Sequence, residues 1–191
     1  MKNIVLVSYN KYPIDPHLSL SSASVPPDSP VIEEIDFVKN VGEDSASSFR
    51  EGSEPSQAFL PSGNGWMADK SELPAFIWRA FSHRKVRPSR ISFLPRQGEG
   101  LPNAVRRMPS KYEFIGSNES PCRTDGNWVV LCKDLSGERI TGLYQARGCE
   151  VEEVHRSTSF QCVGLKILQK GGGETRYTTA LRKIRMWGVL D

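Results

Sequence analysis

Short apolar runs, each ended by turn residues, fill this 191-residue chain between Ala58 and Val189. They are rich in aromatic and β-branched residues, and Gly, Pro, Asn and Ser separate them. The clearest runs are Phe76–Phe81, Arg90–Leu94, Lys111–Ile115, Trp128–Cys132, Cys162–Leu168 and Ala180–Trp187. No helical pattern reaches three turns, and evenly spaced runs of this kind are typical of an all-β sandwich or barrel. Such a scaffold presents loops at its ends, so the pattern favours a binding module.

The composition changes near residue 30. Proline and serine dominate residues 1–30, which predicts a flexible leader. One sandwich domain is then expected over residues 31–191, a length that buries a core without staples. Val31–Val38 is open to two interpretations, a first strand or a short helical turn. The polar stretch Gly42–Gln57 predicts a loop, and Gly171–Glu174 predicts a tight hairpin.

Charge is divided unevenly along the chain. Residues 1–57 carry four basic and nine acidic side chains, a net charge of −5, whereas residues 58–191 carry 21 basic and 13 acidic ones, a net charge of +8. A basic domain favours anionic partners such as sulfated or sialylated glycans or phospholipid head groups. The alternative is an ordinary solvated surface of mixed charge. We expect a glycan, an anionic surface ligand or a protein as partner, and no nucleic acid.

The four cysteines are Cys122, Cys132, Cys149 and Cys162. Four cysteines allow three disulfide connectivities, and we favour sequential pairing, Cys122–Cys132 and Cys149–Cys162, because each bridge then closes a short loop. The alternative is four reduced thiols. A zinc site is not expected, since no Cys-x-x-Cys pair is present.

Cysteine usage and the N-terminal sequence point to different compartments. Paired cysteines favour an oxidising compartment. The first ten residues have only four consecutive apolar residues, Ile4–Val7, fewer than a signal peptide needs. No apolar run approaches the ~20 residues that cross a bilayer, so no transmembrane segment is expected. We expect an extracellular or cell-surface location, with the cytoplasm as the alternative.

The sequence lacks the motifs of common enzymes. It contains no Gly-x-Ser-x-Gly elbow, no phosphate-binding P-loop and no His-Glu-x-x-His pair. Glu152 and Glu153 are adjacent, and on a strand they would point to opposite faces. The chain is therefore predicted not to be an enzyme.

Seven segments, in order, give the chain a resemblance to the coagulation factor 5/8 type C, or discoidin, domain of the galactose-binding-like superfamily. They are Ser56–Leu60 leading to Gly65-Trp66, Leu73–Trp78, Pro88–Gln97, Lys111–Asn118, Trp128–Leu131, Phe160–Ile167 and Leu181–Gly188. The resemblance implies an eight-stranded jelly-roll β-sandwich without catalysis, whose loops bind sugars, lipids or proteins in a lectin-like or adhesive role.

Two departures from that family bear on ligands. Many relatives carry an Asp-Gly-rich loop that helps to bind calcium, but here Leu60–Gly65 has no carboxylate and the next is Asp69. Calcium prefers six to eight oxygen ligands, so we expect no cofactor, with a structural calcium ion as the alternative. The His–Arg spacing of fucose-binding relatives is not reproduced from His83.

Candidate ligand-binding residues come from two loops. Arg96, Arg106 and Arg107 lie in one, and His155 and Arg156 lie in another. Guanidinium groups suit hydroxyl pairs and carboxylates, and we expect the two loops to converge at one end of the sandwich. The alternative is that these are solvated surface charges.

Tryptophan is the other candidate for sugar recognition, because an aromatic face packs against a sugar ring. Trp66 is a candidate stacking platform, although a core position is favoured. The other three, Trp78, Trp128 and Trp187, are predicted to be core residues. The chain is thus predicted to be a non-enzymatic recognition module that binds carbohydrate or an anionic surface through loops at one end. The alternative is an intracellular protein-interaction subunit with the same jelly roll.

Overall fold

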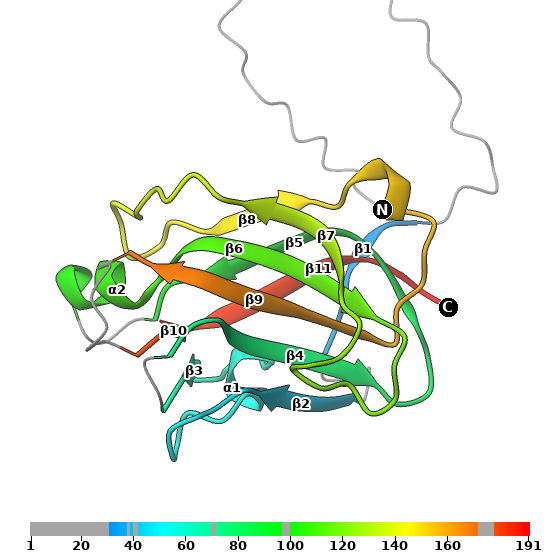
Figure 1. Ribbon diagram of the computed structural model, residues 1–191, viewed down its shortest axis with the longest axis horizontal. Helices are drawn as coiled ribbons and strands as arrows, with labels where there is room; N and C mark the ends of the chain where they lie inside the picture. The colour runs from blue at the N-terminus through cyan, green and yellow to red at the C-terminus, as the bar shows by residue number, and fades with distance from the viewer. Residues whose placement is uncertain (1–30, 38, 40–41, 70–71, 97–99, 172–177) are drawn as a thin grey trace, which may run out of the picture.

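The computed structural model describes residues 31–37, 39, 42–69, 72–96, 100–171 and 178–191 (Figure 1). The leader predicted at residues 1–30 lies outside them, as does most of the hairpin predicted at Gly171–Glu174. The strands are β1 (Glu33–Glu34), β2 (Gly42–Ala46), β3 (Trp66–Met67), β4 (Ala75–Phe81), β5 (Val86–Leu94), β6 (Pro109–Ser117), β7 (Val129–Asp134), β8 (Arg147–Glu150), β9 (Cys162–Lys170), β10 (Ala180–Leu181) and β11 (Lys183–Leu190). The helices are α1 (Ser56–Phe59), α2 (Leu101–Arg107) and the 3-10 turn η1 (Glu153–His155).

Two antiparallel sheets pack face to face. The five-stranded sheet has the order β2-β4-β9-β6-β7 and lies in front in Figure 1, and the four-stranded sheet has the order β1-β11-β5-β8 and lies behind it. A short β10-β3 ladder completes the fold. Three of the eleven described strands have two residues, which leaves eight longer ones. The predicted all-β sandwich is confirmed.

Strand alternation builds the core between the sheets. In β11, Ile184 and Met186 are buried while Arg185 between them is half-buried, and in β6 Tyr112 and Phe114 are buried. The Tyr112 ring meets Phe93 of the opposite sheet edge to face at 4.8 Å. Alternating apolar side chains of two facing sheets therefore form one contiguous core.

The predicted runs coincide with strands, but the short strands β2, β3 and β8 were missed. Gly42–Ala46, predicted to be part of a loop, is the edge strand β2, which pairs with β4. Arg147–Glu150 is β8, which pairs with β5. Both are short, polar edge strands, and an edge strand needs only one hydrogen-bonding neighbour and no apolar alternation. Of the two interpretations of Val31–Val38, the structure shows a strand, limited to β1.

All four cysteines are in disulfides, but the favoured pairing was wrong. The bridges are Cys122–Cys162 and Cys132–Cys149, with sequence separations of 40 and 17. Cys132 on β7 and Cys149 on β8 belong to edge strands of different sheets, so this bridge links the two sheets. Cys122–Cys162 ties the β6–β7 loop to the start of β9. Nearness across the sandwich decides the pairing, and loop length along the chain does not.

The two ends of the sandwich carry different segments. The end drawn at the left of Figure 1, called here the loop end, carries α2 and the β5–β6 and β7–β8 loops. The opposite end, called here the terminal end, carries Asp191, η1 and the β6–β7 loop. Within the described residues, no helix has the length and apolarity needed to cross a membrane.

Candidate functional site

The predicted arginines of the β5–β6 loop lie at the loop end. Arg96 follows β5 and is half-buried, and Arg106 and Arg107 form the last turn of α2. Arg107 Nη1 donates a hydrogen bond to Thr178 Oγ1 at 2.7 Å and lies 3.6 Å from the sulfur of Met67. Arg107 therefore also holds α2 against the segment that leads to β10.

A lysine that sequence reasoning missed joins this group. Lys170 ends β9 and is 3% exposed. Burial and the nearby charge of Arg107 both lower the pKa of the Lys170 ammonium. The neighbouring Gly171 donates its backbone N–H to Met108 O at 2.9 Å, which keeps the end of β9 beside α2. Nothing in the local sequence around Lys170 signals this position, because it depends on strand pairing and on α2.

The second predicted loop lies at the other end. His155 in η1 is half-buried, and Arg156 after it is exposed, with Nε donating to Val151 O at 3.0 Å. Since β5 and β8 are antiparallel, the loop after β5 and the loop after β8 leave the sandwich in opposite directions. The structure therefore does not bring His155 and Arg156 together with the three arginines, and the expected convergence of the two loops was wrong.

The tryptophans divide between core and surface. Trp66 is fully buried, and its Nε1 donates to Ser48 O at 3.0 Å, so it is a core residue and offers no face to a ligand. Trp128 and Trp187 are half-buried, which corrects their assignment to the core. Trp187 lies on the outer face of the four-stranded sheet under Arg90, whose guanidinium carbon is 5.0 Å from the ring centroid.

Trp78 is buried, but in a second apolar cluster on the outer face of the five-stranded sheet. Its ring meets Trp128 edge to face at 6.0 Å, and Phe76, Ile115 and Cys162 complete the cluster. A groove of about 210 Å³ runs beside this cluster, between the β2–β4 edge and the β6–β7 loop. Hydroxyl, amide and carboxylate groups line it together with Trp78. This groove has polar and apolar groups of the kinds that contact sugars, and the sequence did not signal it, because Trp78 was predicted to be a core residue.

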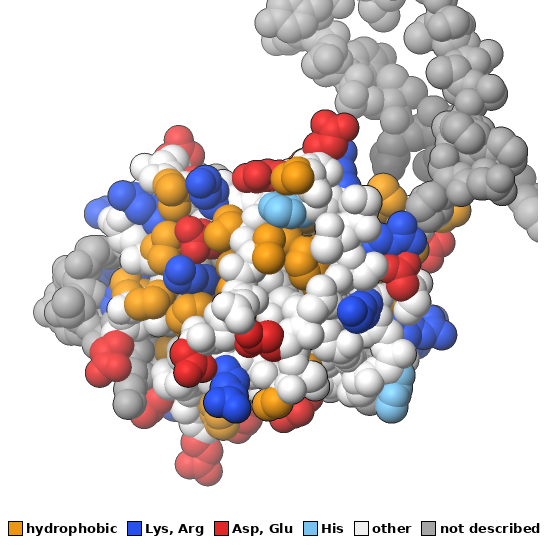
Figure 2. All heavy atoms as spheres, turned by 45° about the vertical axis from the view of Figure 1, so that its right-hand side comes forward, with side chains coloured by type: hydrophobic (Ala, Val, Ile, Leu, Met, Phe, Trp, Pro, Cys, Tyr) orange, Lys and Arg blue, Asp and Glu red, His pale blue; other side chains and the backbone are white. Residues whose placement is uncertain are grey.

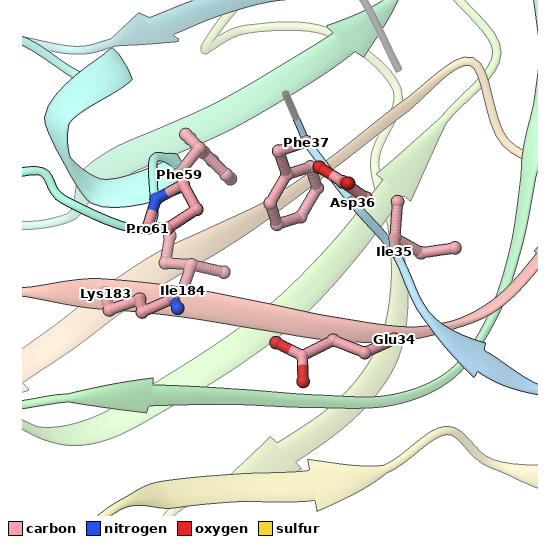
Figure 3. A pocket seen from close by; sticks show the side chains of 8 residues that line it. All are labelled: Glu34, Ile35, Asp36, Phe37, Phe59, Pro61, Lys183 and Ile184. Carbon is pink, nitrogen blue, oxygen red and sulfur yellow. The ribbon is translucent and has the colours of Figure 1, made fainter. Parts of the chain in front are cut away.

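A different hollow opens at the edge of the sandwich (Figure 3). It has a volume of about 250 Å³ and lies between β1, β11 and the segment around α1. The apolar side chains in the close-up are Ile35, Phe37, Phe59, Pro61 and Ile184. Glu34, Asp36 and Lys183 stand around them, and Glu34 pairs with Arg185 Nε at 3.6 Å. With apolar walls and few polar groups directed inward, this hollow lacks the donors and acceptors that fix a sugar.

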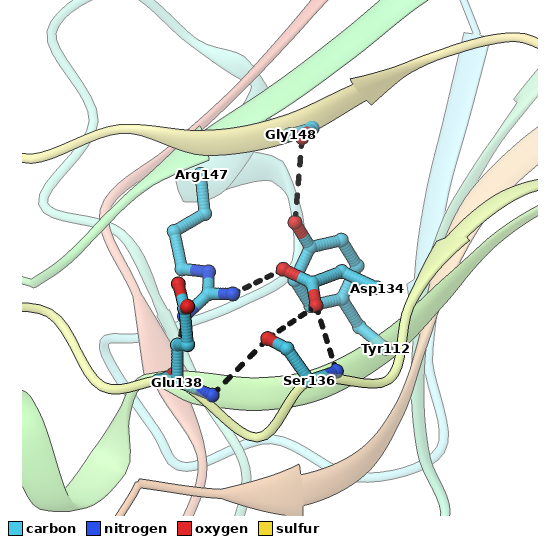
Figure 4. Close-up of polar contacts among 6 residues, drawn as sticks. All are labelled: Tyr112, Asp134, Ser136, Glu138, Arg147 and Gly148. Carbon is cyan, nitrogen blue, oxygen red and sulfur yellow. Dashed lines mark hydrogen bonds and ion pairs between the residues drawn. The ribbon is translucent and has the colours of Figure 1, made fainter.

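A polar network beside the Cys132–Cys149 bridge is structural (Figure 4). Arg147 pairs with Asp134, and Ser136 Oγ donates to Asp134 Oδ1 at 2.7 Å. Burial raises the pKa of the Tyr112 hydroxyl to about 12. Burial alone would raise the pKa of Asp134, but hydrogen bonds from Ser136 and Arg147 outweigh it and lower that pKa. These groups satisfy one another, so the network joins β7 to β8 and leaves little for a ligand.

The part of the chain that the structure describes offers no set of side chains that could bind a metal ion together. There, no three His, Cys, Asp or Glu side chains lie close enough together to hold a metal ion. Asp69, the first carboxylate after the segment that matches the calcium loop, is exposed.

No protein-family model and no curated protein matches the sequence. Solved structures do match the fold. A family 32 carbohydrate-binding module of Clostridium perfringens NanJ, solved with galactose, has a TM-score of 0.58 at 14% identity and covers 82% of this chain and 99% of its own. A module of the same family from a C. perfringens family 31 glycoside hydrolase has a TM-score of 0.59 at 14% identity, over 82% of this chain and 95% of its own.

Chitosan-binding module 1 of a Paenibacillus sp. IK-5 chitosanase/glucanase matches with a TM-score of 0.55 at 20% identity, over 77% of this chain and 95% of its own. At these identities the comparisons show the fold alone. Family 32 carbohydrate-binding modules share the galactose-binding-like fold with discoidin domains. This chain therefore has a galactose-binding-like β-sandwich.

Proposed function

We propose that this protein is a non-catalytic recognition module that binds carbohydrate, with acidic glycans bound at the loop end. The observation that carries the proposal is the grouping of cations there: Arg106 and Arg107 form the last turn of α2, and the hydrogen bond from Gly171 N–H to Met108 O holds the end of β9, with Lys170, beside that turn. Arg106 precedes Arg107 in α2, and Arg96 lies at the start of the same loop. The positive potential of such a group favours a carboxylate or sulfate, and guanidinium groups can bind either one bidentately.

The fold supports a carbohydrate as the ligand that bears this carboxylate or sulfate group. The NanJ module was solved with galactose, and the Paenibacillus module is described as chitosan-binding. No enzymatic motif was found in the sequence, in keeping with a module that binds and does not catalyse.

The disulfides support an extracellular location. Two bridges join all four cysteines, and such bonds persist in oxidising compartments and are rare in the cytosol. This weighs against the alternative of an intracellular protein-interaction subunit.

Binding to sialylated and sulfated oligosaccharides tests the proposal. The double variant Arg96→Ala/Arg106→Ala is expected to weaken binding at least ~10-fold, because each charged hydrogen bond contributes roughly 1.5–3 kcal/mol. Arg107 is left intact because it also contacts Thr178 and Met67. Isothermal titration calorimetry measures the change.

Arg156→Ala, which removes an exposed arginine at the terminal end, is the matched control and should bind as the wild type does. Equal binding by the double variant and the wild type would reject the loop end as the site. Failure of the wild type to bind any acidic glycan would reject the proposed ligand class.

A further inference from the structure

We propose a second binding site, in the groove between the β2–β4 edge and the β6–β7 loop, that takes a positively charged amino sugar. The groove, called here the acidic groove, is defined by Glu43, Trp78, Ser82, Glu119, Ser120 and Gln161. It lies toward the terminal end, away from the arginines of the loop end. The inference rests on the proposed function only for the class of ligand, carbohydrate, and its location and charge preference are independent.

The charge of the groove selects the ligand. Its described lining includes two carboxylates, Glu43 and Glu119, and neither lysine nor arginine. Glu43 is exposed on the edge strand β2, and Glu119 is half-buried in the β6–β7 loop. A protonated amine is attracted to this pair of negative charges, and an acidic sugar is repelled. The preference is opposite to that proposed for the loop end.

The other groups of the groove suit the rest of a sugar. Ser82 and Ser120 supply hydroxyls and Gln161 an amide, which can donate to and accept from sugar hydroxyls. The exposed Pro121 and the largely buried Trp78 line the groove beside them and give it an apolar wall. The volume of about 210 Å³ lies below the range of drug-sized pockets and suits a single sugar residue.

The walls of the groove are held in place by bonds. The Cys122–Cys162 bridge fastens the β6–β7 loop to β9. Asn118 spans the same junction, donating to Ser159 O at 3.0 Å and accepting from the backbone N–H of Gln161 at 3.1 Å. Asn127 Nδ2 donates to Glu119 Oε1 at 2.6 Å and orients that carboxylate. A preformed site loses less entropy on binding.

Trp78 depends on a glycine for its position. Gly164 of β9 lies opposite Trp78 on β4, and a Cβ built on Gly164 would lie 2.6 Å from the Cβ of Trp78. Any side chain at this position would displace the tryptophan. The other side of Trp78 is supported by Trp128, whose Nε1 donates to Arg123 O at 2.7 Å.

A neighbouring hollow extends the groove along the surface. It shares Glu119, Ser120 and Pro121 with the groove and adds Arg123 and Asp125. The combined surface has three carboxylates and one guanidinium, so it stays acidic. Figure 2 turns the terminal end toward the viewer and shows mainly white polar and backbone atoms around its centre, with charged side chains set apart. The neighbouring hollow has a volume of about 410 Å³, which leaves room for a short oligomer of amino sugars beyond the first residue.

Titration of the full chain with a trimer of glucosamine tests the inference, at a pH where its amines are protonated, beside the neutral N-acetylglucosamine trimer. The wild type is expected to bind the glucosamine trimer at least ~10-fold more tightly than the N-acetylated one. Glu43→Gln/Glu119→Gln removes both charges while keeping hydrogen-bonding groups, and should weaken glucosamine binding at least ~10-fold. Glu152→Gln, an exposed acid outside the groove, is the matched control and should change nothing. Circular dichroism checks that each variant folds.

The loop-end variant separates this inference from the proposed function. Arg96→Ala/Arg106→Ala should bind the glucosamine trimer as the wild type does, even where it loses acidic glycans. Equal affinity for the two trimers, no binding of the glucosamine trimer, or unchanged binding by the Glu43/Glu119 variant would overturn the acidic groove. None of these outcomes bears on acidic glycan binding at the loop end.

Discussion

Asp44 and Arg79 form a buried ion pair under the edge of the sandwich. Arg79 Nε lies 3.7 Å from Asp44 Oδ1, and the two side chains are 6% and 9% exposed. Arg79 Nη2 donates to Phe37 O at 3.0 Å, and its guanidinium carbon lies 5.0 Å from the Phe37 ring centroid. Burial raises the pKa of Asp44 to about 6, and Arg79 opposes this only in part. Burial likewise lowers the pKa of Arg79.

This pair predicts a pH-dependent stability. The pKa of Asp44 is about 6 in the folded protein and 3.8 ordinarily, so the folded state binds the proton more tightly. Its stabilising contribution is complete below pH 3.8 and is lost as the pH rises through about 6. The free energy of unfolding of the wild type, relative to Asp44→Asn, should fall by at most about 3 kcal/mol across this window. Urea unfolding at pH 4, 5 and 6.5 measures it, and a constant difference would contradict the prediction.

The contacts of Arg147 predict a second effect of a single residue on stability. Its side chain is 9% exposed, pairs with Asp134 and lies with its guanidinium carbon 5.7 Å from the Tyr112 ring centroid. Arg147→Ala leaves Asp134 without its cation and should lower the free energy of unfolding by about 2–3 kcal/mol. Arg139→Ala, which removes an exposed arginine of the loop before β8, should change it by less than about 0.5 kcal/mol. Similar losses in the two variants would show that the network does not stabilise the fold.

At the scale of elements, edge strands and bridges close the sandwich. The polar strand β2 covers one side of β4, and β8 covers one side of β5. The five-stranded sheet ends at β7 and the four-stranded sheet at β8, and the Cys132–Cys149 bridge joins these two edges. The hydrogen bond from Tyr112 Oη to Gly148 O, at 3.5 Å, spans the same gap. The bridge and the network thus close one side of the sandwich together.

Removal of the Cys132–Cys149 bridge should destabilise the protein. The bridge closes a loop of 17 residues, which corresponds to about 3 kcal/mol of unfolded-state entropy. Cys132→Ser/Cys149→Ser should therefore lower the free energy of unfolding by about that amount in thermal or urea denaturation. Its two cysteines lie outside the acidic groove, so binding of the glucosamine trimer should persist below the melting temperature.

Removal of the Cys122–Cys162 bridge should affect ligand binding as well, in contrast to removal of the Cys132–Cys149 bridge. Cys122 and Cys162 both line the acidic groove. Cys122→Ser/Cys162→Ser should therefore weaken glucosamine binding as well as stability. A loss of binding confined to the Cys132/Cys149 variant would contradict the assignment of the two bridges.

At the scale of the whole molecule, the sandwich separates two kinds of surface. The loop end groups Arg96, Arg106 and Arg107 with Lys170, whereas the acidic groove near the terminal end presents Glu43 and Glu119. A net charge of only +3 for the chain conceals this separation. We expect the two surfaces to respond in opposite directions to the sign of charge on a glycan, because the proposed site at the loop end consists of arginines and the acidic groove has two carboxylates.

The amino-acid sequence alone indicated the class of fold. Short runs rich in aromatic and β-branched residues, ended by turn residues, are typical of strands, so Phe76–Phe81 and Cys162–Leu168 predicted strands that the structure contains. It also identified the cysteines and the arginines of the loop end. It did not reveal β2, β8 or Lys170, whose places depend on a neighbouring strand or helix.

The packing of the two sheets brings together residues that are distant in the chain. It paired Cys132 with Cys149 across two sheets, buried Trp66, and separated His155 from Arg106. It also formed the acidic groove from Glu43 and Glu119, which lie 76 positions apart in the chain. Local sequence patterns indicate which side chains of a strand are buried. The end of the sandwich at which the next loop emerges depends instead on the direction in which the strand runs. That direction is fixed by long-range pairing, which leaves no mark on the loop's own sequence.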